Sequence, residues 1–236
     1  MDGNNFMKLN IKELLDFFDD KKDSQKGDAG ALMAIFGEDL NASAYKHFRK
    51  NKVEILEDRV NQGLKKEKRL DRWILDKKNK KLFQCEIKSC AATAIGGKQL
   101  KSDAGDEEIK KVTSYHCNRE LENIFSKRVK HPNSITKVLL KMRSPERYRN
   151  ISKIEPLLIY WMPITFDKKG LNPWSILPIR PLHLSIKTEF PKLGIFSVSL
   201  YLRQLYKKGK GKRFIDLDMP HFDHRMRIIK KIQNQK

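Results

Sequence analysis

The stretch from Leu70 to Ala92 constrains the fold of this chain more than any other part of the sequence. Residues 72–75 and 81–88 are rich in β-branched, aromatic and other apolar side chains, which strands favour. The residues between these two runs are polar and include Asn79, which tolerates a tight turn. The pattern predicts a β-hairpin, so we expect a sheet that includes both runs.

The second run is expected to carry polar groups on one face of its strand. Side chains alternate between the two faces of a strand. One face receives Leu82, Gln84, Glu86 and Lys88, and the other receives Phe83, Cys85 and Ile87. Glu86 and Lys88 are then about 7 Å apart along the strand. Asp71 stands 15 positions before Glu86 and can lie beside it if the hairpin register allows; Asp76 is the alternative acid.

Two acids and a lysine on neighbouring strands suit metal-dependent hydrolysis. Asp71 and Glu86 could hold a hard divalent cation such as Mg²⁺, which prefers oxygen ligands. Such a cation lowers the pKa of a bound water and stabilises charge on a phosphoryl oxygen, and Lys88 could orient either group. The alternative is that Glu86 and Lys88 form only a weak surface ion pair. The apolar residues behind them and the acid on the preceding strand favour a site.

This arrangement resembles the catalytic signature of the PD-(D/E)XK nuclease superfamily, which includes many restriction endonucleases and repair or recombination nucleases. The residues that carry the resemblance are Asp71, Glu86, Ile87, Lys88 and Ser89. Leu70 stands where the pattern has proline, a position that is often replaced. The resemblance covers residues 31–162. It implies an α/β fold with a restriction-endonuclease-like core, in which helices flank a mixed central sheet.

The resemblance also implies roles for these residues. Asp71 and Glu86 would hold Mg²⁺, for which Mn²⁺ would substitute, and the backbone carbonyl of Ile87 would complete the site. Lys88 would position or help to deprotonate the attacking water, and the cut would leave a 5′-phosphate. In many of these nucleases, a glutamate on the helix before the first core strand reaches the metal. Glu38 matches that position, with Asp39 as the neighbouring alternative; Glu38 could equally be an exposed helical acid.

The charge of the chain indicates a polyanionic partner. There are 50 Lys and Arg against 29 Asp and Glu, a net charge of +21, which is typical of nucleic-acid binding. The alternative is a lysine coat that only keeps the protein in solution. Three basic segments could contact DNA. They contain Lys98, Gln99 and Lys101; Arg143, Arg147 and Arg149; and Lys208, Lys210, Lys212 and Arg213.

Hydrophobic periodicity predicts the remaining elements. The expected helices are 6–20, 31–50 and 106–127, the last with Ile109, Val112, Tyr115 and Cys117 on its buried side and His116 at the surface. The expected strands are 53–60, 155–163 and 193–205. Residues 155–163 form the most apolar run, and we expect a buried strand parallel to its neighbour beside the hairpin. Residues 166–181 should be an irregular loop, and residues 207–213 the basic tip of a hairpin.

These elements predict a short N-terminal helix and linker over residues 1–30 and one nuclease domain over 31–236. The domain would have its core at 31–165, and 166–236 would add basic hairpins and loops that contact DNA. The chain lacks a secretory signal and an apolar run of membrane-spanning length. Its three cysteines have no metal-binding spacing. The simplest interpretation is that they are reduced thiols in a cytoplasmic protein.

The sequence therefore predicts a Mg²⁺-dependent endonuclease that hydrolyses double-stranded DNA. A type II restriction enzyme that acts as a homodimer on a palindromic site, within a restriction-modification system, fits the size best. Two other functions remain open. One is a repair, recombination or transposon-end nuclease with the same catalytic residues, and the other is a basic nucleic-acid-binding protein without activity.

Overall fold

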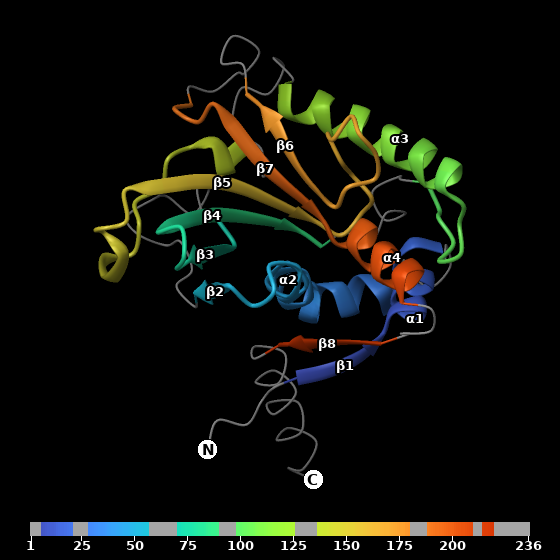
Figure 1. Cartoon of the computed structure of the whole chain (residues 1–236). Helices are drawn as coiled ribbons and strands as arrows, with labels where there is room; N and C mark the ends of the chain where they lie inside the picture. The colour runs from blue at the N-terminus through green and yellow to red at the C-terminus, as the bar shows by residue number, and fades with distance from the viewer. Residues whose placement is uncertain are drawn as a thin grey trace.

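A mixed sheet of six strands forms the centre of the protein, seen here in a computed structural model (Figure 1). The structure describes residues 6–20, 28–56, 70–89, 98–125, 136–179, 188–209 and 214–219. The strand order is β2-β3-β4-β5-β7-β6. The strands are β2 (Val53–Leu56), β3 (Arg72–Asp76), β4 (Lys81–Lys88), β5 (Lys153–Tyr160), β6 (Trp174–Pro178) and β7 (Lys192–Ser197).

The direction of the strands agrees with the predicted mixed sheet. Strands β2, β3 and β4 are antiparallel neighbours, as expected for the strand at residue 53 and the hairpin. Strand β5 is parallel to β4 and to β7, so the predicted buried parallel strand is confirmed. Strand β6 closes the sheet antiparallel to β7. The α/β class with a mixed sheet is therefore confirmed.

The turn of the β3–β4 hairpin holds its shape through Asp76 and Asn79. The Asp76 carboxylate accepts hydrogen bonds from the backbone N–H of Asn79 at 3.1 Å and from its side-chain amide at 2.8 Å. Within this turn, the residue with a positive φ is Lys80, at 45°. Asn79 thus contributes to the turn by hydrogen bonding, and the left-handed conformation falls on the next residue.

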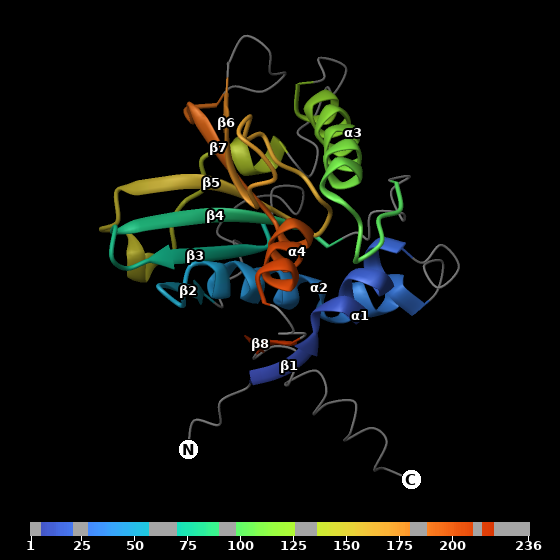
Figure 2. The same cartoon turned by 45° about the vertical axis from the view of Figure 1, so that its right-hand side comes forward.

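Helices cover both faces of the sheet (Figures 1 and 2). The helices are α1 (Ile11–Leu15), α2 (Asp28–Phe48), α3 (Asp106–Phe125) and α4 (Val198–Lys208). The described residues also form a π-helical turn at Asp16–Asp20 and two 3₁₀ turns at Thr136–Leu139 and Glu146–Tyr148. No helix in these described ranges is long and apolar enough to cross a membrane.

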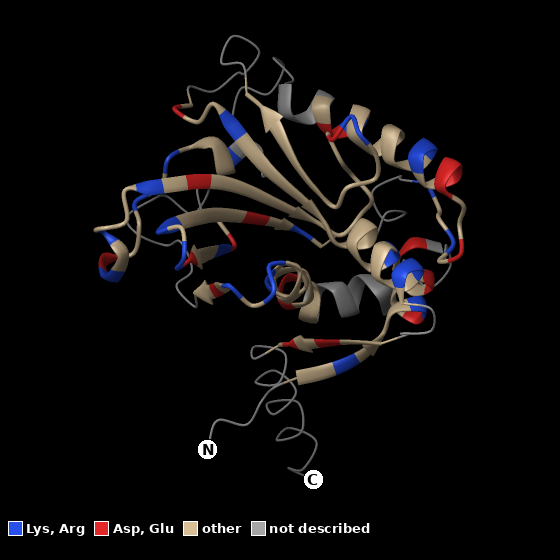
Figure 3. Cartoon of the chain, in the orientation of Figure 1, with Lys and Arg blue, Asp and Glu red and all other residues tan. Residues whose placement is uncertain are grey.

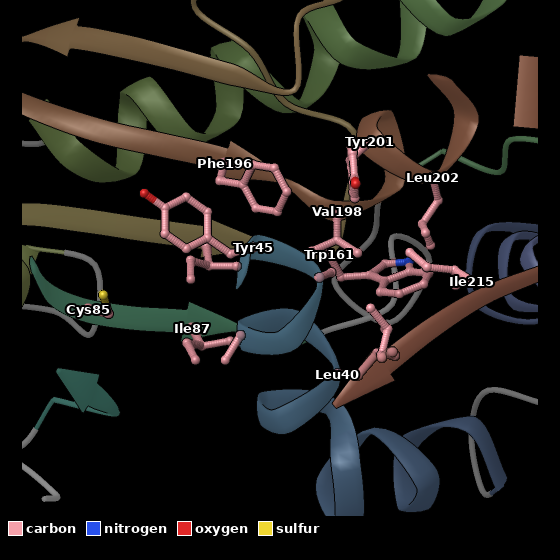
Figure 4. Packing of buried hydrophobic residues seen from close by; sticks show 14 of the residues in the cluster. Leu40, Tyr45, Cys85, Ile87, Trp161, Phe196, Val198, Tyr201, Leu202 and Ile215 are labelled. Atoms are coloured by element: carbon pink, nitrogen blue, oxygen red, sulfur yellow. The ribbon is translucent and has the colours of Figure 1, made fainter. Parts of the chain in front are cut away.

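Alternation along the strands divides the core into two layers. On one face, Ile87 and Cys85 pack with Tyr45 of α2 and Val198 of α4 (Figure 4). On the other face, Trp73 and Leu82 pack with Cys117 of α3 and with the first 3₁₀ turn. Glu86 and Lys88 follow Leu82 on β4 at even spacings, so their side chains are on the same face of the strand and face this second layer.

The first described residues form a strand, where the sequence predicted a helix over 6–20. Strand β1 (Phe6–Asn10) pairs antiparallel with β8 (Phe214–Asp218), and this ribbon lies on the far side of α2 from the main sheet (Figures 1 and 2). Asn10 ends the strand and caps α1, because its side chain accepts from the backbone N–H of Lys12 at 3.0 Å. A partner strand more than 200 residues away decided this conformation.

The N-terminal segment is packed on the region predicted as the nuclease domain. Ile11, Leu15 and Phe18 are buried in the same core cluster as the strands of the main sheet. The position of the domain boundary stays a prediction.

The predicted strand over 193–205 is correct only as far as Ser197. The Ser197 hydroxyl accepts from the backbone N–H of Leu200 at 3.2 Å and donates to the Met162 carbonyl at 2.8 Å. It therefore caps a helix, α4, at the point where β7 ends. The alternating apolar residues were misleading because Val198, Tyr201 and Leu202 also share one helix face. The residues before the basic segment are thus helical, so the predicted basic-tipped hairpin is wrong.

The segment 166–181, predicted as irregular, contains the edge strand β6. Its Trp174 packs across β7 at Gly194, where an added Cβ would approach the tryptophan ring to 2.7 Å. Pro173 directly before the strand and Pro178 at its last position concealed it in the sequence.

Helix α3 is confirmed over Asp106–Phe125, but two of its residues exchange their predicted places. Tyr115 is 37% exposed and His116 is fully buried. The His116 Nδ1 lies 3.1 Å from the Pro163 carbonyl oxygen, so a tertiary hydrogen bond allows the imidazole to be inside.

Candidate active site

Asp71 lies immediately before β3 and is held against β4. Its backbone N–H donates to the Cys85 carbonyl at 3.1 Å. Its carboxylate Oδ2 accepts from the backbone N–H of Ile87 at 2.7 Å. The hairpin register, in which Arg72 faces Cys85, therefore brings Asp71 beside Glu86 and Ile87. The alternative acid, Asp76, lies at the opposite end of β3 in the turn.

Glu86 and Lys88 point from β4 to the same side. The Lys88 Nζ is 2.7 Å from Glu86 Oε1. Glu86 is only 6% exposed, and its second oxygen, Oε2, is buried with no hydrogen-bond partner among the described residues. This pair is therefore more than an exposed surface ion pair, because burial of an incompletely satisfied carboxylate is unfavourable.

Both acids ionise less readily than usual. Burial, together with the charge of Asp71, raises the pKa of Glu86 to about 7, although Lys88 opposes the shift. Burial also raises the pKa of Asp71, and the charge of Glu38 adds to this effect. The hydrogen bond from Ile87 and the charge of Lys88 act in the opposite direction. Two neighbouring carboxylates with raised pKa values are a common mark of functional sites.

Helix α2 brings two further acids to the edge of the site. The Arg72 Nη2 lies 3.4 Å from Glu38 Oε2 and 3.3 Å from Asp39 Oδ1. The Arg72 Nη1 donates to the Asp71 carbonyl at 2.9 Å. The Glu38 side chain is 39% exposed, whereas that of Asp39 is 3% exposed. Glu38 thus lies close enough to influence Asp71, but it pairs with an arginine.

Arg72 was not recognised from the sequence as part of the site. The signal available was a charged residue in an otherwise apolar strand, directly after the candidate acid Asp71. A buried arginine requires carboxylate or carbonyl partners, so its presence already implied acids nearby.

Further polar groups surround Glu86. Tyr160 of β5 lies in register with Lys88, and its hydroxyl donates to Glu120 of α3 at 2.9 Å. Lys137 in the first 3₁₀ turn lowers the pKa of Glu86 through its charge. After β4, the Asn41 side-chain amide donates to the Ser89 hydroxyl at 3.1 Å. Of these residues only Ser89 was predicted from the sequence, because the other four come from distant segments.

The donors present suit a divalent cation held by two carboxylates. Within the described part of the chain, no three acidic, histidine or cysteine side chains are already gathered into a metal-binding group. Asp71 and Glu86 nevertheless lie together with raised pKa values, and the buried Glu86 Oε2 has no partner in the part of the chain that the structure describes. A Mg²⁺ ion commonly uses one or two carboxylates and keeps several waters. These residues therefore fit Mg²⁺, with Glu38 as a third acid that at present contacts Arg72.

The predicted DNA contacts at 98–101 lie on a firmly held segment. Arg203 of α4 is buried and donates to the Leu100 carbonyl at 2.9 Å and to the Lys101 carbonyl. Arg203 also pairs with the buried Asp19 at 2.8 Å, whose backbone carbonyl accepts from Leu100 at 3.0 Å. Lys98 and Gln99 precede this anchor, and the Lys98 ammonium lies 5.1 Å from the ring centre of Tyr115. The segment thus presents exposed cations on a rigid base.

The second predicted basic group is spread along the sheet. Arg143 follows Met142, whose N–H donates to Gln84 in the middle of β4 at 3.1 Å. Arg147 and Arg149 lie near the start of β5, which is in register with the start of β4. Glu86 and Lys88 are at the other end of β4, which has eight residues. About 20 Å separates the two ends of such a strand. The structure therefore does not bring Arg147 and Arg149 to the acids.

The third basic group is described only at Lys208. Lys208 lines a surface cavity of about 690 Å³ between α3, α4 and residues 167–172, and none of the candidate acids lines this cavity. Lys210, Lys212 and Arg213 lie outside the described residues. Figure 3 shows Lys and Arg from the outer tip of β5 to the end of α4, so the positive charge is not confined to one face.

No family model matches the sequence, and no curated protein or solved structure matches the chain. The resemblance to the PD-(D/E)XK superfamily therefore stays a prediction that depends on the residues and strand order described above.

Proposed function

We propose that this protein is a Mg²⁺-dependent endonuclease that hydrolyses phosphodiester bonds of double-stranded DNA. One observation carries the proposal. The partly buried Asp71 and the buried Glu86, two acids with raised pKa values, lie together beside Lys88 at the end of β4. A structural ion pair would not explain why one Glu86 oxygen has no partner among the described residues, or why a second acid lies next to it.

Each residue would have a distinct part in hydrolysis. Asp71 and Glu86 would hold the cation, and the Ile87 carbonyl would complete the site. A bound Mg²⁺ or Mn²⁺ supplies a water of lowered pKa and stabilises charge on the phosphoryl oxygen. Lys88, 2.7 Å from Glu86 Oε1, would direct the attacking water or the scissile phosphate. The products would carry a 5′-phosphate.

Several features support DNA as the substrate. The net charge is +21, and Lys98 and Lys101 project from a rigid segment that follows the catalytic hairpin in the chain. Binding should therefore weaken steeply as salt rises, because each neutralised phosphate releases counterions. The biological role that we prefer is that of a type II restriction enzyme, acting as a homodimer in the cytoplasm. The size and the positive charge of the chain favour this role.

Cleavage of a long duplex DNA of known sequence tests the proposal. Wild-type protein is incubated with Mg²⁺ or with EDTA, beside Lys88→Ala and a control, Lys81→Ala. Lys81 starts the same strand, is about as exposed as Lys88 and pairs with Glu155 at 2.9 Å, so it controls for the loss of a lysine ion pair away from Asp71 and Glu86. We expect Mg²⁺-dependent cleavage by wild type and the control, and none by Lys88→Ala.

The pattern of products separates the candidate roles. Discrete bands indicate a site-specific enzyme and reveal its site. A smear with the same Mg²⁺ and Lys88 dependence indicates a repair or recombination nuclease, which is then tested on branched DNA. No cleavage by any of the three proteins, with a salt-sensitive gel shift for all, contradicts the enzymatic proposal and leaves a nucleic-acid-binding protein.

A further inference from the structure

Arg72 lies between the acids of α2 and Asp71, which precedes β3. It is 4% exposed and contacts Glu38, Asp39 and the Asp71 backbone. Its Nε is buried and has no hydrogen-bond partner among the described residues. Arg72 therefore balances the charge of Glu38 and Asp39 and also holds the backbone of Asp71.

The two acids that share Arg72 differ in their freedom to move. Asp39 is buried at 3% exposure, so its departure from Arg72 would leave a carboxylate charge unpaired inside the protein. The two acids lie at similar distances from the guanidinium, 3.4 Å for Glu38 and 3.3 Å for Asp39, but Glu38 is 39% exposed, so water can solvate its carboxylate when it leaves Arg72. Glu38 can therefore exchange its partner at low cost, whereas Asp39 cannot.

We propose that Glu38 exchanges Arg72 for the divalent cation when the cation binds, while Asp39 remains as the permanent partner of Arg72. This inference rests on the proposed metal site at Asp71 and Glu86. It makes Arg72 a positioning residue that competes with the cation for Glu38 and so lowers the affinity of the site. It also assigns different roles to the two consecutive acids.

Binding of Mn²⁺ to the full chain without DNA, measured by calorimetry, tests the exchange. The main variant is Arg72→Gln with Asp39→Asn, which removes the buried pair together and leaves the net charge unchanged. Its amide groups can still hydrogen-bond to each other, and circular dichroism checks the fold. We expect about fivefold tighter Mn²⁺ binding, the size of one partly exposed ion pair.

The source of the tighter binding is then traced to Glu38. Glu38→Gln alone should weaken Mn²⁺ binding roughly tenfold, because one carboxylate ligand is lost. Adding Arg72→Gln and Asp39→Asn to Glu38→Gln should bring no tightening, since the competition no longer exists. The matched control is Arg49→Gln with Asp76→Asn, a second arginine–aspartate pair on β3 at 2.9 Å. It should leave Mn²⁺ affinity unchanged.

Two results would overturn the inference. Equal or weaker Mn²⁺ binding in the Arg72→Gln, Asp39→Asn variant is one, and tightening that persists without Glu38 is the other. An Asp71→Asn variant separates this failure from failure of the proposed function. If Asp71→Asn abolishes Mn²⁺ binding, the metal site stands and only the exchange is wrong. If Mn²⁺ binding is absent in wild type or insensitive to Asp71→Asn, the metal site fails, and the exchange fails with it.

Discussion

The acids at the two ends of the β3–β4 hairpin have pKa values shifted in opposite directions. At the turn, Asp76 accepts from Asn79 and from Arg49, at 2.9 Å for the arginine. Burial alone would raise the pKa of Asp76, but these hydrogen bonds and charges lower it below its usual value. At the other end, burial raises the pKa values of Asp71 and Glu86, and the nearby partners do not compensate.

This difference separates structural acids from candidate functional ones. Glu155, at the start of β5, belongs to the first group: burial tends to raise its pKa, but three lysines around it lower the pKa overall. A protein that only needed stability could have satisfied Asp71 and Glu86 in the same way. The incomplete compensation at one end of the hairpin fits the proposed site for a divalent cation.

The largest effect should appear in catalysis. Asp71→Asn should reduce Mg²⁺-dependent DNA cleavage by roughly 10³-fold, because a cation ligand is lost. Asp76→Asn, on the same strand, should retain the cleavage rate per folded molecule. The rates are measured in single turnover, with circular dichroism to count folded protein. Similar losses in both variants would show that the two ends do not differ in function.

The second effect concerns stability and its dependence on pH. An acid with a raised pKa destabilises the folded state once it is ionised, so stability falls as pH rises from 4.5 towards about 7 for Glu86. Glu86→Gln should therefore be more stable than wild type in EDTA above pH 7, by up to about 3 kcal/mol. The advantage should vanish near pH 4.5, the ordinary pKa of the acid.

Asp76→Asn provides the opposite case in the same urea denaturation series. The lowered pKa of Asp76 in wild type means that the ionised acid stabilises the fold above pH 3.8. This contribution is lost as the pH falls further. We expect a loss of about 2 kcal/mol near neutral pH, because Arg49 loses its partner. Parallel pH profiles for the two variants would contradict the contrast between the ends.

The smallest effect should be in DNA binding. Lys98→Ala with Lys101→Ala should weaken binding severalfold and reduce the slope of affinity against salt by about 1 to 2, one phosphate contact each. Arg147→Ala with Arg149→Ala, at the distant end of the sheet, should change the slope less. Fluorescence anisotropy over a salt series measures both. Equal changes would mean that DNA extends along the whole sheet.

Much of the fold near the candidate site follows from local sequence. The hairpin, the shared face of Glu86 and Lys88, the parallel strand β5 and helix α3 are all predictable. They depend on alternation, turn residues and helical periodicity, which act over a few neighbouring positions. Residues 6–10 and 198–208 were predicted wrongly, because their apolar patterns suit both a strand and a helix and distant partners decided between them.

By itself, the sequence determined that acids and a lysine are carried on adjacent strands of a strongly basic chain. Only the tertiary structure decided their electrostatic state. The burial of Glu86, the contact between Asp71 and Ile87, and the arginine that joins α2 to β3 arise from segments far apart in the chain. The pKa of a carboxyl group depends on all the charges and solvent around it, and only packing in three dimensions brings these together.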